Sequence, residues 1–291
     1  MRPATAKRRL VADIGGTNAR FAVSEAPGHI RDARSFLVSD HSGLAAALRT
    51  YREALADPAP FEEALIAGAG PVENGEIQLT NAPWRMTAAD LDDVLPRGGA
   101  GRFVNDLEAV AFSTPHLQDD QLAVIRSAPR PLDRPRLVVN VGTGFGAALA
   151  IPAASGWLFL VGEAGHMAFA ARSEEEADLL ERAEIVEQVL SGPALKGLRR
   201  DALSPPRGER DPLFSAILGR VVGDLALSMG ALGGVYLCGG VIDEWRETGG
   251  AADFLEHFDD KGVMRRRMER TPVHAITERD PALVGLSHAS V

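Results

Sequence analysis

A strand-turn-strand pattern, LVADIGGTNARFAV at residues 10–23, recurs in altered form as LVVNVGTGFGAALA at residues 137–150. In each copy an apolar run is followed by a turn of glycine and threonine and by a second run of small or apolar residues. The pattern predicts a buried strand that turns tightly back into another strand. Glycine in such a turn lets backbone N–H groups approach a ligand that a Cβ atom would exclude. Two turns of this kind that face one ligand would clamp a polyphosphate.

Length and composition indicate an ordinary globular protein of two domains. The chain has 291 residues, 45% of them hydrophobic and 24% charged, which is enough for two separate cores. Its net charge of −9 argues against a nucleic-acid partner, because nucleic-acid-binding surfaces are basic. Three basic stretches, 7–9, 126–136 and 265–270, are short and are flanked by acids or prolines. We interpret them as solvated loops and helix faces.

The remaining composition points to a reducing compartment and away from membranes. Cys238 is the only cysteine, so an internal disulfide is excluded and a structural zinc site is disfavoured. No signal peptide is expected, because Asp13 interrupts the apolar run behind the basic start of the chain. The uncharged stretches 137–162 and 225–242 are rich in glycine, and buried strands explain them better than membrane helices do.

Strands alternate with helices along the whole chain, which favours an α/β fold with a mixed sheet. In the first half, the expected helix near 42–55 has Ser42 as its N-cap. The Pro-rich segment 128–136 connects to a second half that opens with the same three-strand pattern. The expected strands are 9–14, 18–24, 34–38, 63–68, 101–104, 137–151, 157–161, 234–238 and 272–276. The expected helices are 42–55, 87–94, 174–182, 184–190, 193–200, 213–229 and a short one from about 281.

The first glycine turn carries the residue types that a phosphate site needs. Gly15, Gly16 and Thr17 offer backbone donors and a hydroxyl, and Asn18 follows them. Asp13, where the strand ends, could hold Mg²⁺ through water, because this ion prefers oxygen ligands and keeps its hydration shell. An ordinary Gly-rich β-turn is the equally weighted alternative.

Two further glycine segments follow the same logic. Gly142, Thr143 and Gly144 form the turn of the second copy and have the same alternative reading. Gly239 and Gly240 follow a strand and could admit a base or a ribose against bare backbone. A plain strand-to-helix turn would also explain that pair.

Polar side chains near strand ends are candidates for a polyol site. Asp106, after Asn105 at a strand end, is placed to accept a proton from a hydroxyl, although from spacing alone an N-cap is the better explanation. Carboxylate, imidazole and amide groups can share hydrogen bonds with a polyol, and each could equally be structural. The candidates of this kind are Asn81, Glu163, His166 and Glu187.

Taken in order, the motifs resemble the bacterial glucokinase family, hexokinase-like sugar kinases of the actin-like ATPase superfamily. The resemblance spans nearly the whole chain, and the set NDLEAVA, GEAGH and LSGP is its most specific part. The segments that carry it are LVADIGGTNARFAV, LTNAPW, FVNDLEAVA, NVGTGFGAAL, GEAGHMAF, VEQVLSGPAL and GGVYLCGGV.

The resemblance implies a two-domain actin-like ATPase (ribonuclease H-like) fold with a deep interdomain cleft. It implies a small α/β domain at 1–109, on which a C-terminal helix at 280–291 packs, and a large α/β domain at 110–279. It makes Asp106 the catalytic base for the sugar 6-hydroxyl. The implied sugar-binding residues are Asn81, Asn105, Asp106, Glu163, His166 and Glu187. The implied nucleotide-binding residues are Asp13, Gly15, Gly16, Thr17, Asn18, Gly142, Thr143, Gly144, Gly239 and Gly240.

The activity implied is that of glucokinase: ATP-dependent conversion of D-glucose to glucose 6-phosphate, the entry to glycolysis, with ATP and Mg²⁺ as cofactors. A cytoplasmic homodimer without nucleic-acid or membrane partners is also implied. A kinase for fructose, mannose or an amino sugar is the alternative, and a non-catalytic sugar sensor ranks below it. The chain lacks the zinc-binding cysteine cluster of the related repressor/ORF/kinase (ROK) group. Its connection between Pro193 and residue 213 is shorter than in many relatives.

Overall fold

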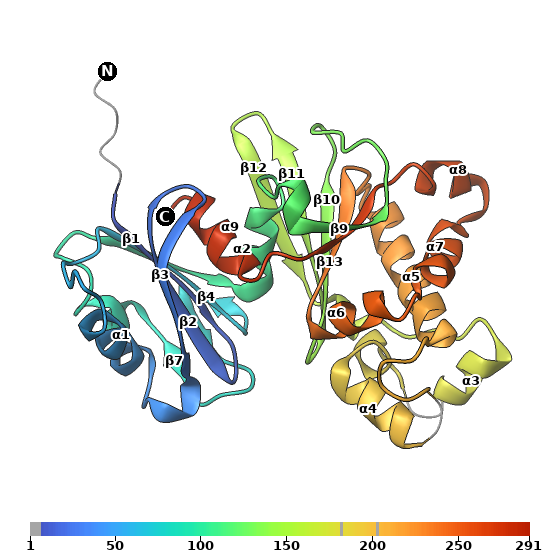
Figure 1. Cartoon of the computed structure of the whole chain (residues 1–291), viewed down its shortest axis with the longest axis horizontal. Coiled ribbons are helices and arrows are strands. Elements are labelled where there is room, and N and C mark those ends of the chain that lie inside the picture. Colours follow the sequence, from blue (N-terminus) through green and yellow to red (C-terminus); the bar gives the residue numbers. More distant parts are fainter. Residues whose placement is uncertain (1–6, 181–182, 202–203) are drawn as a thin grey trace. The chain divides into compact units, whose positions relative to one another are not determined.

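The computed structural model describes residues 7–180, 183–201 and 204–291 (Figure 1). The chain divides into two compact units, Met1–His116 with Arg279–Val291, and Leu117–Glu278. The sequence had suggested boundaries at 109/110 and 279/280. The first of these falls inside the helix Asp106–Ser113, which belongs wholly to the first unit.

The first unit is built on a five-stranded sheet of order β3-β2-β1-β4-β8. β1 pairs antiparallel with β2 and parallel with β4, and β4 pairs parallel with β8. The strands of this sheet are β1 (Arg9–Ile14), β2 (Asn18–Ala26), β3 (His29–Leu37), β4 (Glu63–Gly68) and β8 (Ala100–Asn105). A small sheet contains β5 (Val72–Glu73), β6 (Glu76–Gln78) and β7 (Arg85–Met86). The helices are η1 (Val38–Asp40), α1 (Leu44–Glu53), η2 (Ala88–Leu91), α2 (Asp106–Ser113) and α9 (Pro281–His288).

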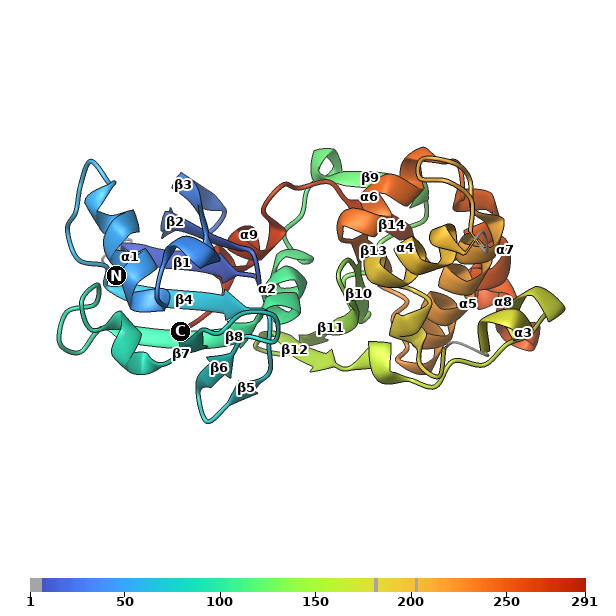
Figure 2. The ribbon, with the colours of Figure 1, turned by 90° about the horizontal axis from the view of Figure 1, so that it is seen from below.

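Successive side chains of β1 point to opposite faces of the sheet, and both faces are covered. Leu10, Ala12 and Ile14 share one fully buried cluster with residues of α1. On the other face α9 packs along β1 and α2 (Figures 1 and 2). The two helices cross closely, because a Cβ atom on Gly285 would lie 1.9 Å from the carbonyl oxygen of Ala109. A residue without a side chain is therefore required at this crossing.

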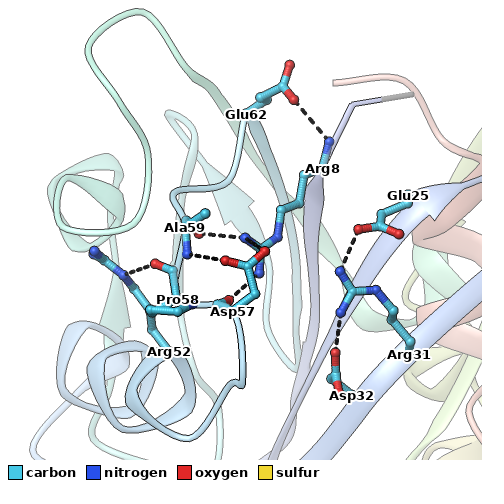
Figure 3. A network of polar contacts seen from close by, with 9 residues as sticks. All are labelled: Arg8, Glu25, Arg31, Asp32, Arg52, Asp57, Pro58, Ala59 and Glu62. Carbon is cyan, nitrogen blue, oxygen red and sulfur yellow. Dashed lines mark hydrogen bonds and ion pairs between the residues drawn. The ribbon is translucent and has the colours of Figure 1, made fainter. Parts of the chain in front are cut away.

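Figure 3 shows a network in which charged residues of the first unit are paired with one another. Arg8 donates to the Asp57 carboxylate and to the carbonyl oxygen of Ala59, both at 3.0 Å. Its guanidinium also lies 5.0 Å from the centre of the Phe61 ring. Arg31 forms ion pairs with two carboxylates of its neighbourhood. The basic stretch at 7–9 therefore ties the segment before β4 to β1 and is not a polyanion footprint.

The second unit is built on a six-stranded sheet of order β12-β11-β10-β13-β14-β9. β10, β13 and β14 are parallel to one another. The strands are β9 (Leu122–Arg126), β10 (Arg136–Val141), β11 (Phe145–Ala153), β12 (Gly156–Gly162), β13 (Gly234–Cys238) and β14 (Val273–Ile276). The helices are α3 (Glu174–Leu180), α4 (Gly192–Arg200), α5 (Pro212–Ser228), α6 (Gly240–Glu247), α7 (Ala251–Asp259) and α8 (Arg265–Met268), with single turns η3 (Asp119–Gln121), η4 (Ala164–His166), η5 (Val186–Gln188) and η6 (Gly262–Met264).

The apolar stripe of α5 forms the centre of the second core, as its helical period predicts. The stripe packs with Leu137, Val139 and Val235 from the sheet. α7 lies directly against α5: a Cβ atom on Gly219 would come within 2.1 Å of the Phe254 carbonyl oxygen. Bare backbone at Gly219 therefore allows the two helices to touch.

Several local expectations were wrong. Ser42 is not the N-cap of α1; Gly43 occupies that position without a side-chain bond. The helix expected at 87–94 is the 3₁₀ turn η2, which Thr87 caps. The helix expected at 184–190 is only η5, because Ile185 bridges to Ala168 as a strand residue does. The end of the helix expected at 174–182 lies outside the described residues.

Candidate active site

The parallel strands of the first unit bring the first set of candidates to one edge of the sheet. Ile14, Gly68 and Asn105 stand side by side in the register of β1, β4 and β8. Strands lie about 4.8 Å apart, so about 10 Å separates the backbones of the two outer residues. The turn that begins at Gly15 and the first residue of α2, Asp106, therefore project from the same edge.

The first glycine turn is shaped by its neighbours. The Gly15 N–H donates to the Asn18 carbonyl oxygen at 2.9 Å, and Thr17 is exposed. A Cβ atom on Gly16 would lie 2.9 Å from the Cβ atom of Asn81, so the loop after Thr80 packs directly on the turn. Asn81 is exposed there. Asn81, a candidate sugar ligand, thus lies directly beside the first glycine turn.

Asp13 lies at the base of this turn with a cationic partner. Arg20, opposite it on β2, donates to its carboxylate at 3.2 Å. Burial raises the pKa of Asp13, and the charge of Arg20 opposes that rise. Arg20 also lies 3.7 Å from Asp280, the residue before α9. The guanidinium therefore bridges the candidate metal ligand and the start of the C-terminal helix.

Asn105 and Asp106 divide their tasks at the start of α2. The Asn105 side chain caps the helix, since its Oδ1 accepts from the Leu107 N–H at 2.9 Å. Its Nδ2 donates to the Gly70 carbonyl oxygen at 3.1 Å. Asp106 is the first helical residue, half-buried, and its Oδ1 accepts from the same Leu107 N–H at 2.9 Å. Because Asn105 is the N-cap, the capping explanation for Asp106 is unnecessary.

In the second unit the turn after β10 meets the start of α4. The Gly142 N–H donates to the Gly144 carbonyl oxygen at 2.9 Å, and Thr143 is exposed. The Gly192 N–H in turn donates to the Gly142 carbonyl oxygen at 2.8 Å. Ser191 caps α4 through its side chain. The N-terminus of α4, which favours anions, thus stands beside the second glycine turn.

Glu187 sits in a cradle made by two glycines. Its Oε2 accepts from the Phe145 N–H at 2.8 Å. A Cβ atom on Gly144 would lie 2.5 Å from that oxygen, and one on Gly165 would lie 3.1 Å from it. The carboxylate is therefore held in a fixed position where β11 begins.

Glu163 and His166 flank the same region on η4. The imidazole Nδ1 lies 4.0 Å from the Glu163 carboxylate, and the two side chains are 67% and 80% exposed. The next residues run beside the segment before Glu187: the Val186 N–H donates to the Met167 carbonyl oxygen at 2.9 Å. Three of the candidate sugar ligands are therefore grouped on one part of the second unit.

The third glycine segment requires glycine for conformational reasons. Gly239 has φ of 102°, and a Cβ atom there would lie 2.4 Å from Asn140 Oδ1 and from the Val141 carbonyl oxygen. Gly240, by contrast, is exposed, with open space at its Cβ position. β13 thus ends in a bare turn beside β10, from which α6 starts.

A cavity of about 500 Å³ adjoins this turn in the second unit. Gly192 and Val241 line one side of it, and Lys196, Arg199 and Arg207 bring cationic side chains. Arg199 and Arg207 both form ion pairs with Glu244, at 2.9 and 2.8 Å. Sequence reasoning missed this cavity; the basic residues after the LSGP motif are its only sequence signal.

Two features are absent from the described part of the chain: a helix that could cross a membrane and a cluster of metal-binding side chains. None of its helices combines the length and apolarity that crossing a membrane requires. Within 7–180, 183–201 and 204–291, no three His, Cys, Asp or Glu side chains are grouped as a metal site. Mg²⁺ does not need such a group, since it is commonly held by one or two carboxylates together with substrate phosphates.

Comparisons with known proteins agree on one family. A family model described as Glucokinase matches residues 10–204 and 212–291. The glucokinase of Marinobacter nauticus is 35% identical over 312 residues, covering 96% of this chain and 96% of that protein. The crystal structure of glucokinase from an Antarctic psychrotroph superposes with a TM-score of 0.83 at 29% identity, covering 97% of this chain and 98% of that chain. A ROK family glucokinase from Streptomyces griseus in complex with glucose and AMPPNP shares the fold, with a TM-score of 0.57 at 18% identity over 96% of this chain and 98% of that one.

Proposed function

This chain belongs to the glucokinase family, and on that premise we propose how its residues transfer a phosphoryl group from ATP to glucose. The family resemblance seen in the sequence is confirmed, and with it the two-domain actin-like ATPase fold and the hexose-phosphorylating activity. The family model leaves residues 205–211 unmatched. They lie in the connection before α5 that the sequence had marked as short.

Asp106 is proposed as the general base. The supporting observation is the division of tasks at the start of α2, where Asn105 supplies the cap and Asp106 stands at the sheet edge that also carries the glycine turn. Its carboxylate would accept the proton of the sugar 6-hydroxyl as that oxygen attacks the γ-phosphorus. General-base catalysis of this kind contributes on the order of 10²–10⁴ in rate.

The remaining sugar contacts are proposed for hydroxyl recognition. Asn81, Asn105, Glu163, His166 and Glu187 would donate to or accept from the hydroxyls of one hexose. A hexose that lacks or inverts one of these hydroxyls leaves one of these polar groups without its partner, which reduces kcat/KM. Glucose is therefore the proposed substrate, and ranking glucose, fructose, mannose and glucosamine by kcat/KM tests it against the alternative hexoses.

The glycine turns are proposed as the phosphate-binding loops. Gly15 to Asn18 and Gly142 to Gly144 offer backbone N–H groups in turns whose glycines leave room for phosphate oxygens. Asp13 fits Mg²⁺, because one carboxylate together with ATP oxygens and water satisfies this ion. Bound there, Mg²⁺ would neutralise phosphate charge, while Arg20 keeps the Asp13 carboxylate oriented.

The adenosine of ATP is proposed to bind at Gly239 and Gly240. The supporting geometry is the bare backbone of Gly240 together with the adjoining 500 Å³ cavity. Lys196 lines that cavity and would lie near the phosphates. Omitting ATP or Mg²⁺ from the assay tests whether the reaction requires each of them. Replacing ATP with other nucleotides tests whether the site prefers adenosine.

A cytoplasmic homodimer that feeds glycolysis completes the proposal. An ATP-consuming kinase requires the cell's ATP pool, and the lone Cys238 suits a reducing compartment. Sedimentation equilibrium tests the dimer directly. A mass near that of one 30.9 kDa chain would refute it.

The decisive experiment compares two acids on the first turn of α2. We expect Asp106→Ala to keep glucose binding, measured by calorimetry, and to lose kcat by about 10²–10⁴. Glu108→Gln is the matched control, because Glu108 pairs with Arg102 at 3.1 Å and has no proposed part in the chemistry. Wild-type turnover by Asp106→Ala would refute the base. A folded wild-type chain that releases no ADP with glucose and Mg-ATP would instead favour the sugar sensor.

A further inference from the structure

Two basic stretches that lie far apart in the sequence meet on one surface of the second unit. Arg134 comes from the stretch 126–136, and Arg266, Arg267 and Arg270 come from the stretch 265–270. Together they line an open groove of about 730 Å³, which also contains Asp133 and Thr271. We call this surface the arginine groove. The sequence interpretation had treated the two stretches as separate solvated faces.

The groove lies at the opposite end of the sheet from the proposed nucleotide site. Its residues precede β10 and β14, whereas the turns 142–144 and 239–240 follow β10 and β13. These strands are parallel, so the groove is at their amino ends and the turns at their carboxyl ends. The six residues of β10 separate the two regions by about 20 Å. A ligand in the groove is therefore not the ATP bound at the glycine turns.

Backbone contacts give the groove a fixed floor. The Gly233 N–H, before β13, donates to the Pro135 carbonyl oxygen at 2.8 Å, and the Val235 N–H donates to that of Pro272 at 2.9 Å. These two bonds tie together the three segments that enter the parallel strands. Met268 of α8 is fully buried, and its carbonyl oxygen accepts from Arg126 at 2.8 Å. The helix that carries the arginines is thereby anchored.

Three of the four guanidinium groups of the groove are not neutralised by the described part of the chain. Among the described residues, Arg266, Arg267 and Arg270 form no ion pair. Arg134 is 3.8 Å from Asp133, the only carboxylate lining the groove. Outside the groove, Arg8 of the stretch 7–9 and Arg126 at the start of the stretch 126–136 are each paired with an aspartate. The chain as a whole carries a net charge of −9. We therefore expect this local excess of positive charge to attract an anionic ligand.

We propose that the arginine groove binds a soluble anion with two or more phosphate groups, at a site separate from the active site. Guanidinium groups match phosphate oxygens in paired hydrogen bonds and keep their charge at all physiological pH values. A ligand with several phosphates can engage arginines from both α8 and the segment before β10. A lipid bilayer is disfavoured, because a flat surface reaches a concave groove less well than a small solute does.

Calorimetry with inorganic pyrophosphate in EDTA tests the site. Removing divalent metal weakens binding at the proposed active-site loops, and the full-length chain is used throughout. We expect Arg270→Ala to weaken binding on the order of tenfold and the double variant R266A/R270A on the order of a hundredfold. Arg265→Ala is the matched control, because Arg265 lies beside Arg266 on α8, pairs with Glu269 at 3.1 Å and does not line the groove. It should bind pyrophosphate as the wild type does.

Three outcomes would overturn the proposal. Equal weakening by Arg265→Ala and Arg270→Ala would show general charge attraction without a site. Unchanged binding in R266A/R270A would place pyrophosphate elsewhere. Binding of vesicles rich in anionic phospholipid that depends on Arg266 and Arg270, without binding of pyrophosphate, would assign the groove to a membrane surface. Glucose phosphorylation by R266A/R270A should match the wild type, and Arg270→Lys, which keeps the charge, should lose less affinity than Arg270→Ala.

Discussion

At the scale of single residues, glycines determine where polar side chains of the proposed sugar site lie. Gly144 and Gly165 leave the space that the Glu187 carboxylate occupies beside the Phe145 N–H. Gly16 leaves the space into which Asn81 packs. In both places the absence of a Cβ atom leaves room for a neighbouring polar side chain.

Gly165→Ala should therefore impair glucose binding without unfolding the chain. The new methyl group would meet the Phe145 carbonyl oxygen at 2.5 Å and Glu187 Oε2 at 3.1 Å. A displacement of about 1 Å at a binding group can cost up to about a hundredfold in kcat/KM, so we expect the KM for glucose to rise by about tenfold or more. Gly162→Ala is the control, since its Cβ position is open. Equal KM values for the two variants would contradict the cradle.

At the scale of elements, the first unit depends on how α9 closes over α2 and β1. Arg9 contributes by donating to three carbonyl oxygens at the end of α9, at 2.7–3.2 Å, while it pairs with Glu63. His288, in the last turn of α9, stacks on His116 with ring centroids 3.7 Å apart. The C-terminal helix is thus attached by packing, by charge and by a ring contact.

Gly285→Ala should destabilise this contact. A Cβ atom there would overlap the Ala109 carbonyl oxygen, and overpacking of this kind costs about 1–3 kcal/mol. Gly197→Ala, in α4, meets open space and should gain about 0.5–1 kcal/mol from helix propensity. Urea unfolding measures both free energies. A stability equal to wild type for Gly285→Ala would mean that the helices separate readily.

The histidine stack should make stability depend on pH. Burial, and then the neighbouring His116, lowers the pKa of His288 from 6.5 to about 4. Between pH 6.5 and 4 the unfolded chain therefore binds a proton at His288 that the folded chain excludes. The contribution of neutral His288 to the free energy of unfolding is complete above pH 6.5 and is lost as pH falls toward 4. His288→Gln should reduce the loss of unfolding free energy between neutral pH and pH 5. His29→Gln, which alters an exposed imidazole, should leave that loss unchanged. If the unfolding free energy of the wild type and of both variants depends equally on pH, His288 is not the group responsible.

At the scale of the whole molecule, the second unit is one continuous segment and the first unit is closed by both ends of the chain. Residues 279–291 return to the first unit after the chain has passed through the whole second unit. The first unit therefore needs the C-terminus to complete its core, whereas the second unit does not.

A chain that ends at Arg279 should lose protection in the first unit alone. Hydrogen exchange measured by mass spectrometry should become faster in β1 and β4, which α9 contacts, and stay slow in β10 and β11. A chain that ends at His288 keeps α9 and serves as the control. Equal loss in both units would show that they unfold as one cooperative body.

Periodicity and motif order established most of the architecture before any coordinates. β1, β4, β10, β13 and α5 lie where apolar runs and stripes predicted them. η2 and η5 were mistaken for helices because their short apolar segments fit a helical period. A local capping box of Thr87 and Asp90 starts η2, and pairing of Ile185 with Ala168 keeps the residue before η5 extended. α7 and α8 were not anticipated, and α6 was expected only in the alternative interpretation of Gly239 and Gly240 as a strand-to-helix turn. Their sequences have strong polar faces, and burial against the second core is what selects a helix there.

The sequence by itself determined the family, the two glycine turns and the identity of the candidate base, because those depend on local residue types in a fixed order. Only the tertiary structure decided which residues stand together: Glu187 with Gly144 and Gly165, Arg20 between Asp13 and Asp280, and the arginines of the groove. The reason is physical. Contacts between distant segments follow from strand register and helix packing, and neither is encoded in the spacing of residues along one segment.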